Sequence, residues 1–240
     1  MEPNEMIYHR KSVRSYTGRP VEKATLQQIR DLIPALTPLY PEIRTAAEIV
    51  TRAQVRCICP WTTPQLIAIY SEDHPAAMEN AGFLFQQLEL RLQCMGLGAC
   101  WLGMGRMADA AERRKDGLSC VMMLTFGHPK GKALRESPLE FRRKPLSAIS
   151  DREDSRLEAA RLAPSSVNNQ PWRFLHEGET LHVYCLQQGL LRKAVSEMNR
   201  MDVGIALAHL YLTNPDTFRF FSVPRPPLQS DAVYIGSITL

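Results

Sequence analysis

The order of secondary-structure elements predicted from the sequence occurs twice along the 240 residues, and this repeat limits the folds open to the chain. Hydrophobic patterning in the first half predicts a strand, a long helix and a strand at 66–70, 76–95 and 119–126. The second half has the same elements in the same order, at 181–185, 201–212 and 232–239. Asn80-Ala-Gly82 aligns with Asp202-Val-Gly204 inside the two main helices. We therefore expect an internal duplication; the alternative is that α/β chains repeat such orders by chance.

Two further helices precede irregular segments. Apolar spacing predicts a helix at 24–36, which Pro38 and Pro41 stop soon afterwards. A second helix is expected at 151–162, ahead of a polar loop. In each half a helix and a loop thus come before the first predicted strand.

Composition and charge exclude several classes of protein. A hydrophobic content of 45% over 240 residues can bury a large core, and the net charge of +4 is spread along the chain. This charge favours small anionic ligands and is too low for a nucleic-acid-binding protein. No apolar run is long enough to span a bilayer, and the N-terminus lacks the pattern of a signal peptide. We expect a soluble, cytoplasmic protein without a membrane or nucleic-acid partner.

Six cysteines lack the paired spacings of a disulfide framework or a zinc site. Cys57 and Cys59 are the one close pair. We expect buried, reduced thiols and no metal site.

A basic segment near the N-terminus offers several groups to one small anion. Arg10, Lys11 and Arg14 bracket Ser12 and supply guanidinium, ammonium and hydroxyl donors. Taken alone, the segment is equally typical of a solvated basic surface.

The loop at 163–172, APSSVNNQPW, is rich in hydroxyl and amide groups. Pro164 ends the preceding helix and exposes the residues after it. Ser165, Ser166 and Asn168 can both donate and accept hydrogen bonds, which suits a ring edge with alternating donors and acceptors. The alternative is an ordinary Asx turn beside a packed tryptophan.

A second basic stretch comes after the strand at 119–126. Its glycines, Gly127 and Gly131, are one residue too close for a P-loop, and Ala133 stands where magnesium needs a hydroxyl. Lys130, Lys132, Arg142 and Arg143 are either further cations for the same ligand or a basic surface, and we favour the surface.

The two polar motifs together resemble those of the nitroreductase family of flavin enzymes. The segment at 10–14 is similar to the family's Arg-Arg-Ser-x-Arg, with lysine in second place. Residues 163–172 match its Ala-Pro-Ser-Ser-x-Asn-x-Gln-Pro-Trp. Gly96-Leu97-Gly98 is similar to its Gly-Leu-Gly segment beside the flavin, and 127–129 resembles its Gly-Tyr-Pro with histidine for tyrosine.

The spacing of these motifs departs from the family pattern, in which the loop soon follows the basic segment. The duplication accounts for this, because the loop then belongs to the second unit and completes a site begun in the first. The first unit's own loop, at 36–41, lacks the serines and asparagine, and 142–144 is a degenerate basic segment. The resemblance implies an α+β, nitroreductase-like fold. It would consist of two tandem α/β repeats, 1–134 and 135–240, with central helices and mainly antiparallel sheets forming a pseudo-dimer.

The resemblance also implies one FMN per chain. Its binding residues would be Arg10, Lys11, Ser12, Arg14, Gly96, Leu97, Gly98, Pro164, Ser165, Ser166 and Asn168. Arg10 and Ser12 would hold the phosphate, Arg14 the pyrimidine edge, and the second-half loop the ring, so Ser12 and Ser165 should face one pocket.

The implied activity is an oxidoreductase that passes electrons from NAD(P)H through FMN to a nitroaromatic, quinone or similar small acceptor, acting as a monomer. No residue stands out as an obligatory acid or base, since the flavin carries the chemistry. The alternative is a flavin-binding protein of this fold with a sensing or storage role, or one without redox activity. A nucleic-acid-binding role for 141–145 ranks last, because the interleaved aromatics of such modules are missing.

Overall fold

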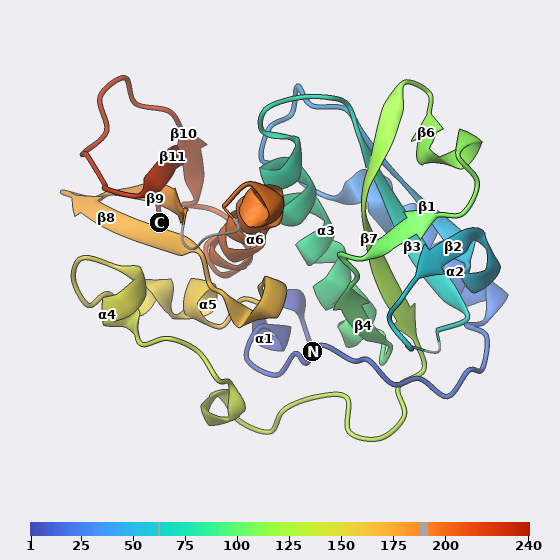
Figure 1. The fold of residues 1–240 in the computed structure, drawn as a ribbon. Helices are drawn as coiled ribbons and strands as arrows, with labels where there is room; N and C mark the ends of the chain where they lie inside the picture. The colour runs from blue at the N-terminus through green and yellow to red at the C-terminus, as the bar shows by residue number, and fades with distance from the viewer. Residues whose placement is uncertain (62, 188–191) are drawn as a thin grey trace.

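Two antiparallel sheets lie on either side of a central pair of helices, α3 (Ala77–Cys94) and α6 (Arg192–Thr213) (Figure 1). The structure is a computed structural model that describes residues 1–61, 63–187 and 192–240. The helix predicted at 76–95 is confirmed as α3. The helix predicted at 201–212 is confirmed as the C-terminal part of the longer α6.

The two sheets have the same topology. In the first, the strand order is β1-β3-β7-β4, formed by Thr45–Thr51, Gln65–Ser71, Leu118–Gly127 and Gly98–Trp101. In the second, the order is β8-β9-β11-β10, formed by Trp172–Glu177, Thr180–Leu186, Ala232–Thr239 and Arg219–Phe221. Along the chain, each half runs through two strands, a central helix, a short strand and a long strand. The strands predicted at 66–70, 119–126, 181–185 and 232–239 are all confirmed.

Shorter elements connect these layers. They are α1 (Pro3–Met6), α2 (Lys23–Leu32), β2 (Val55–Cys57), β5 (Gly105–Met107), β6 (Arg114–Lys115), α4 (Leu146–Ile149) and α5 (Glu158–Arg161). Helix α2 and the 3-10 turn Ile33–Ala35 confirm the helix predicted at 24–36. Among the described residues, no helix has both the length and the apolar character needed to cross a bilayer.

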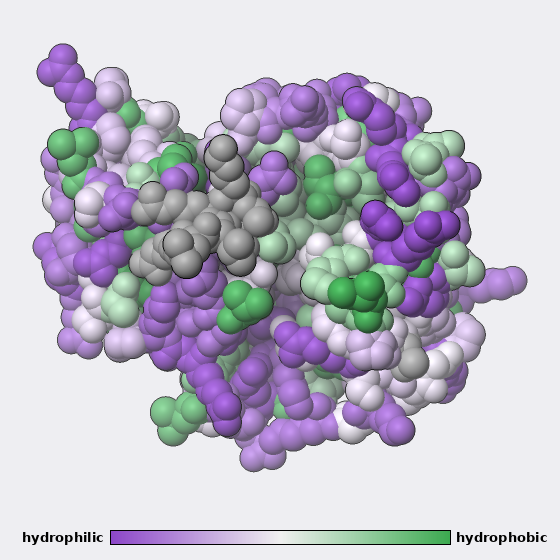
Figure 2. All heavy atoms as spheres, in the orientation of Figure 1, coloured by the Kyte–Doolittle hydropathy of each residue, from purple (hydrophilic) through white to green (hydrophobic). Residues whose placement is uncertain are grey.

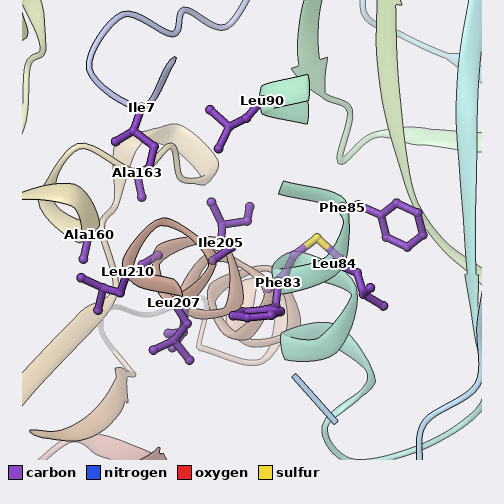
Figure 3. Packing of buried hydrophobic residues seen from close by; sticks show 14 of the residues in the cluster. Ile7, Phe83, Leu84, Phe85, Leu90, Ala160, Ala163, Ile205, Leu207 and Leu210 are labelled. Atoms are coloured by element: carbon purple, nitrogen blue, oxygen red, sulfur yellow. The ribbon is translucent and has the colours of Figure 1, made fainter. Parts of the chain in front are cut away.

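Helices α3 and α6 touch through their backbones at two reciprocal points. A Cβ atom on Gly82 would lie 2.2 Å from the Met201 carbonyl oxygen, and one on Gly204 would lie 2.1 Å from that of Glu79. Neither position has room for a side chain, so glycine permits the close crossing. Around it, apolar side chains from both helices and from the chain near Ile7 and Ala163 form the main core (Figure 3).

Each central helix also holds one loop through a side chain near the crossing. Asn80 Oδ1 accepts hydrogen bonds from the amides of Leu39 and Tyr40, at 3.0 and 2.9 Å. Asp202 Oδ2 accepts one from the Ser166 amide at 3.0 Å. The loops at 36–41 and 163–172 are therefore anchored in equivalent ways.

The helix predicted at 151–162 is confirmed only in its last part, α5 (Glu158–Arg161), and its predicted start is wrong. Residues 155–157 form a 3-10 turn, and α-helix begins only at Glu158. Asp154 Oδ1 accepts a hydrogen bond from the Arg156 amide, and the Asp151 carboxylate accepts one from the His176 amide. Asp154 thus bonds to the backbone two residues later and Asp151 bonds to strand β8, so the segment before Glu158 is held in a non-helical conformation.

Candidate functional site

Arg10 lies directly after the first helical turn and is buried, with 1% of its surface exposed. Its Nη2 and Nε atoms donate to the two carboxylate oxygens of Glu89, at 2.7 and 3.2 Å. Nη2 also donates to Ser12 Oγ at 3.1 Å. The Glu89 carboxylate further accepts hydrogen bonds from Gln86 and Gln93, so this buried pair is fully bonded. Arg10 thus positions Ser12 from beneath the surface.

The basic segment lies against strand β4. The Val13 amide donates to the Ala99 carbonyl at 2.9 Å, and a Cβ atom on Gly98 would lie 2.6 Å from the Val13 side chain. Gly96 ends α3 with a φ of 78°, a backbone conformation in which glycine is unstrained. The structure therefore brings the predicted 10–14 and 96–98 segments together.

The two exposed cations of this segment, Lys11 and Arg14, point in different directions. The Arg14 guanidinium lies 5.6 Å from the ring centre of Trp61, in cation–π geometry. Lys11 Nζ donates to the Lys132 carbonyl at 3.2 Å, and the Lys11 amide donates to Gln93 Oε1. Only Lys11 turns toward the second basic stretch.

The second-half loop is held in a strained conformation. Val167, Asn168 and Gln170 have φ values of 47°, 59° and 49°. Ser165 Oγ accepts a hydrogen bond from the Gln170 amide at 2.9 Å, which closes the turn. Val167 is β-branched, and its side chain is 94% exposed, so packing does not explain why it is there. Backbone strain of this kind concentrates at functional sites.

Arg143 holds this loop through several hydrogen bonds. Its Nη1 donates to Asn168 Oδ1 at 2.7 Å, and its Nε donates to the Ala163 carbonyl at 3.0 Å. The preference for a basic surface is wrong for Arg143, because its side chain is half-buried and bonded within the protein. Arg142, in contrast, is exposed.

Three guanidinium groups crowd together where the two segments meet. Burial lowers the pKa of Arg143 to about 9, and the charges of Arg10 and Arg135 contribute to this lowering. Burial also lowers the pKa of Arg135, again with a contribution from Arg10. Arg135 and Arg143 nevertheless stay charged at neutral pH. Arg135 lies 4.1 Å from the ring centre of Phe141 and donates to the Arg10 carbonyl.

The sequence did not reveal the roles of Glu89 and Arg135. The one signal in the sequence was the position of Glu89 between Leu88 and Leu90 in a helix predicted to be buried, since a buried charge requires a partner. The identity of that partner could not be derived, because Arg10 lies far away along the chain.

The two halves also approach each other at Met198. Its Sδ atom lies 3.7 Å from Ser166 Oγ, and a Cβ atom on Gly103 would lie 3.3 Å from the same sulfur. The segment after β4 therefore faces the second-half loop. That Ser12 and Ser165 line one pocket stays a prediction. Within 1–61, 63–187 and 192–240, no three histidine, cysteine or acidic side chains gather into a metal site.

Comparisons with known proteins identify relatives. The family model described as "Putative TM nitroreductase" matches residues 3–214. The crystal structure of a "putative nitroreductase" from Thermotoga maritima superposes with a TM-score of 0.67 at 20% identity, covering 99% of this chain and 92% of that chain. No curated protein matches the sequence.

Two further solved structures match a smaller part of the chain. A "Putative NADH dehydrogenase/NAD(P)H nitroreductase" from Bacteroides thetaiotaomicron has a TM-score of 0.47 at 18% identity, covering 60% of this chain and 94% of that chain. An "FMN-dependent Nitroreductase" from Clostridium difficile has a TM-score of 0.45 at 14% identity, covering 60% of this chain and 98% of that chain. The family match over 3–214 and the shared fold show that this chain belongs to the nitroreductase family and has a nitroreductase-like fold with mainly antiparallel sheets.

Proposed function

We propose that the protein binds one FMN where its two halves meet and passes electrons from NAD(P)H to a nitroaromatic, quinone or similar small acceptor. One observation carries the proposal. Arg10, Arg135 and Arg143 lie close enough to influence one another's charge, and among the described residues the one buried carboxylate bonded to them is Glu89. The cluster thus has excess positive charge where an anionic ligand would enter.

A phosphate group fits this donor set. Guanidinium groups bind phosphate oxygens strongly, and a phosphate would offset the like-charge repulsion within the cluster. Arg10 is buried, so it contributes its charge and holds the Ser12 hydroxyl in place. Arg143 and Lys11 lie nearer the surface and are the cations that a phosphate could reach.

The isoalloxazine ring would lie between the two halves. Ser165, Ser166 and Asn168 would bond its edge from one side, with Arg14 at the pyrimidine edge on the other. A cation at that edge stabilises the negative charge of a reduced ring. Gly96, Leu97, Gly98 and Pro164 would shape the backbone around it. When bound, FMN supplies the hydride and electron chemistry.

We also infer that the chain is an internal duplication, with units 1–134 and 135–240, and acts as a monomeric pseudo-dimer. The matched topology of the sheets supports this inference. So do the reciprocal contacts of Gly82 and Gly204 and the equivalent roles of Asn80 and Asp202. Chance repetition of element order does not predict side-chain roles that match as well.

Cofactor binding is tested by titrating the purified chain with FMN and following quenching of flavin fluorescence. We expect one FMN per chain. Arg143→Ala should weaken binding roughly tenfold to a hundredfold, since it removes charge-assisted hydrogen bonds of about 1.5–3 kcal/mol. Arg142→Ala is the matched control, because its exposed side chain should leave binding unchanged. A chain that takes up no FMN would remove the proposal.

Electron transfer is tested separately by anaerobic mixing of the FMN-loaded chain with NADH or NADPH. Loss of visible flavin absorbance, and its return on adding a quinone or nitroaromatic, is the expected result. A bound flavin that neither donor reduces would instead support a sensing or storage role.

A further inference from the structure

Two cysteines stand side by side at the end of the small β2–β5 sheet. Cys57 is the last residue of β2, and Cys59 comes two residues later. Both thiols are free and only half-buried, and Ile58 between them is 81% exposed. The prediction of buried thiols is therefore wrong for this pair.

The local geometry brings the two sulfur atoms together. The chain bends at Ile58 and Cys59, directly after β2 ends at Cys57. The Cys59 amide donates to Cys57 Sγ at 3.2 Å. This contact holds the Cys57 sulfur against the backbone of Cys59.

The pair lies near Arg14, one of the residues predicted to bind flavin. Cys57 and Cys59 line a small cavity together with Trp61, Leu102 and Thr125. Cys59 and Trp61 also line a shallow depression that is open to solvent. Trp61 is the ring beneath Arg14, and Leu102 adjoins the Gly103 segment that faces the second-half loop. Figure 2 shows apolar residues beside a hollow near the middle of this face of the molecule.

A cation of the candidate flavin site also acts on Cys59. Burial raises the pKa of Cys59, and its hydrogen bond and interaction with Cys57 raise it further. The charge of Arg14 opposes this rise and favours the thiolate, which is the reactive form of cysteine. A cation that belongs to the candidate flavin site thus also acts on this thiol.

We propose that Cys57 and Cys59 are a dithiol–disulfide couple that exchanges two electrons with the flavin, an inference that rests on the proposed function. In the oxidising direction two S–H bonds break and one S–S bond forms. The two electrons and one proton pass to the oxidised flavin as the equivalent of a hydride, and the second proton passes to the flavin or to solvent. In the reverse direction the reduced flavin returns both electrons and the disulfide opens to two thiols.

The couple itself can be read without cofactor. Trypsin cleaves after Arg56 and Arg91, so one peptide contains Cys57 and Cys59 and no other cysteine. The full chain is equilibrated anaerobically in glutathione buffers of increasing oxidising strength, alkylated and digested. We expect this peptide to lose two alkylation sites together and to become lighter by two hydrogens. Cys57→Ser and Cys59→Ser should each prevent this change, whereas Cys120→Ser, a half-buried thiol of the neighbouring five-stranded sheet, should not. A wild-type peptide that keeps both thiols in every buffer overturns the proposal.

The link to flavin is tested on the FMN-loaded chain in its disulfide form. After photochemical reduction of the flavin without oxygen, its absorbance should return in the dark while two thiols become alkylatable. In Cys59→Ser it should stay reduced. A wild-type flavin that also stays reduced overturns the exchange. A colourless chain that takes up no FMN fails the proposed function and the exchange with it, at a step visible before any thiol is measured.

Discussion

The two halves share a topology but differ in their loops. In the first half, Asn80 holds a loop whose residues Leu39 and Tyr40 pack into the protein. In the second half, Asp202 holds a loop that keeps its polar groups and pushes Val167 into solvent at positive φ. Equivalent hydrogen bonds therefore hold a packed loop at 36–41 and a strained loop at 163–172 that carries hydroxyl and amide groups. The comparison separates what maintains the fold from what the proposed site requires.

The largest effect is expected where the halves are most alike. Gly82→Ala places a Cβ atom against the Met201 backbone, so α3 and α6 must move apart. We expect a loss of roughly 4 kcal/mol in the free energy of unfolding, measured by chemical denaturation, with a similar loss for Gly204→Ala. Gly103→Ala is the control, because it meets only the flexible Met198 side chain. If either Gly82→Ala or Gly204→Ala kept the stability of the wild type, the two contacts between the helices would not be equivalent.

A smaller effect concerns a position at which the halves use different residues. Gln87 Nε2 donates to the Thr37 carbonyl at 2.7 Å, and His209 Nδ1 makes the same type of bond to the Ala159 carbonyl at 2.9 Å. Burial lowers the pKa of His209 to about 3 from its ordinary 6.5. The unfolded chain therefore binds a proton that the folded chain does not. Stability from this residue is present above the unfolded pKa and is lost as the pH falls toward the folded one.

His209→Gln copies the first half and should remove that part of the acid sensitivity. Between pH 7 and 4 we expect the wild type to lose up to about 3 kcal/mol more unfolding free energy than the variant. Denaturation series at several pH values measure the difference. Parallel pH profiles would show that His209 is not held neutral.

The smallest effect concerns the strained loop. Val167→Asn should raise the free energy of unfolding by about 1 kcal/mol, because asparagine tolerates positive φ better than a β-branched residue. Ile58→Asn changes another exposed apolar residue, one without positive φ, and should give no such gain. If the two variants behave alike, surface polarity and not backbone strain distinguishes the loops.

The central elements could be predicted because their signals are local. The long apolar stretch of α3 and the apolar runs of β3 and β11 each indicate their structure without knowledge of the partner. Strands β1 and β10 were not predicted. Most of β1 is half-buried and lacks an alternating pattern, and the three-residue β10 depends on pairing with β11.

The site was predictable only where a motif stood in the sequence. The 10–14 segment and the 163–172 loop could be recognised from their residues. The role of Arg143 could not, because it depends on a contact with Asn168 across the fold and on burial beside Arg10. A cation in a basic run has the same appearance in sequence whether it faces solvent or a neighbouring guanidinium.

The glycine contacts between α3 and α6 have a consequence beyond stability. Because both helices meet through backbone atoms, neither can slide or rotate against the other without a clash. The sheets attached to them are held at one separation, and so are the 10–14 segment and the 163–172 loop. The absence of a side chain at Gly82 and Gly204 thus sets the distance between the 10–14 segment and the 163–172 loop, and with it the size of a ligand that can bind between them.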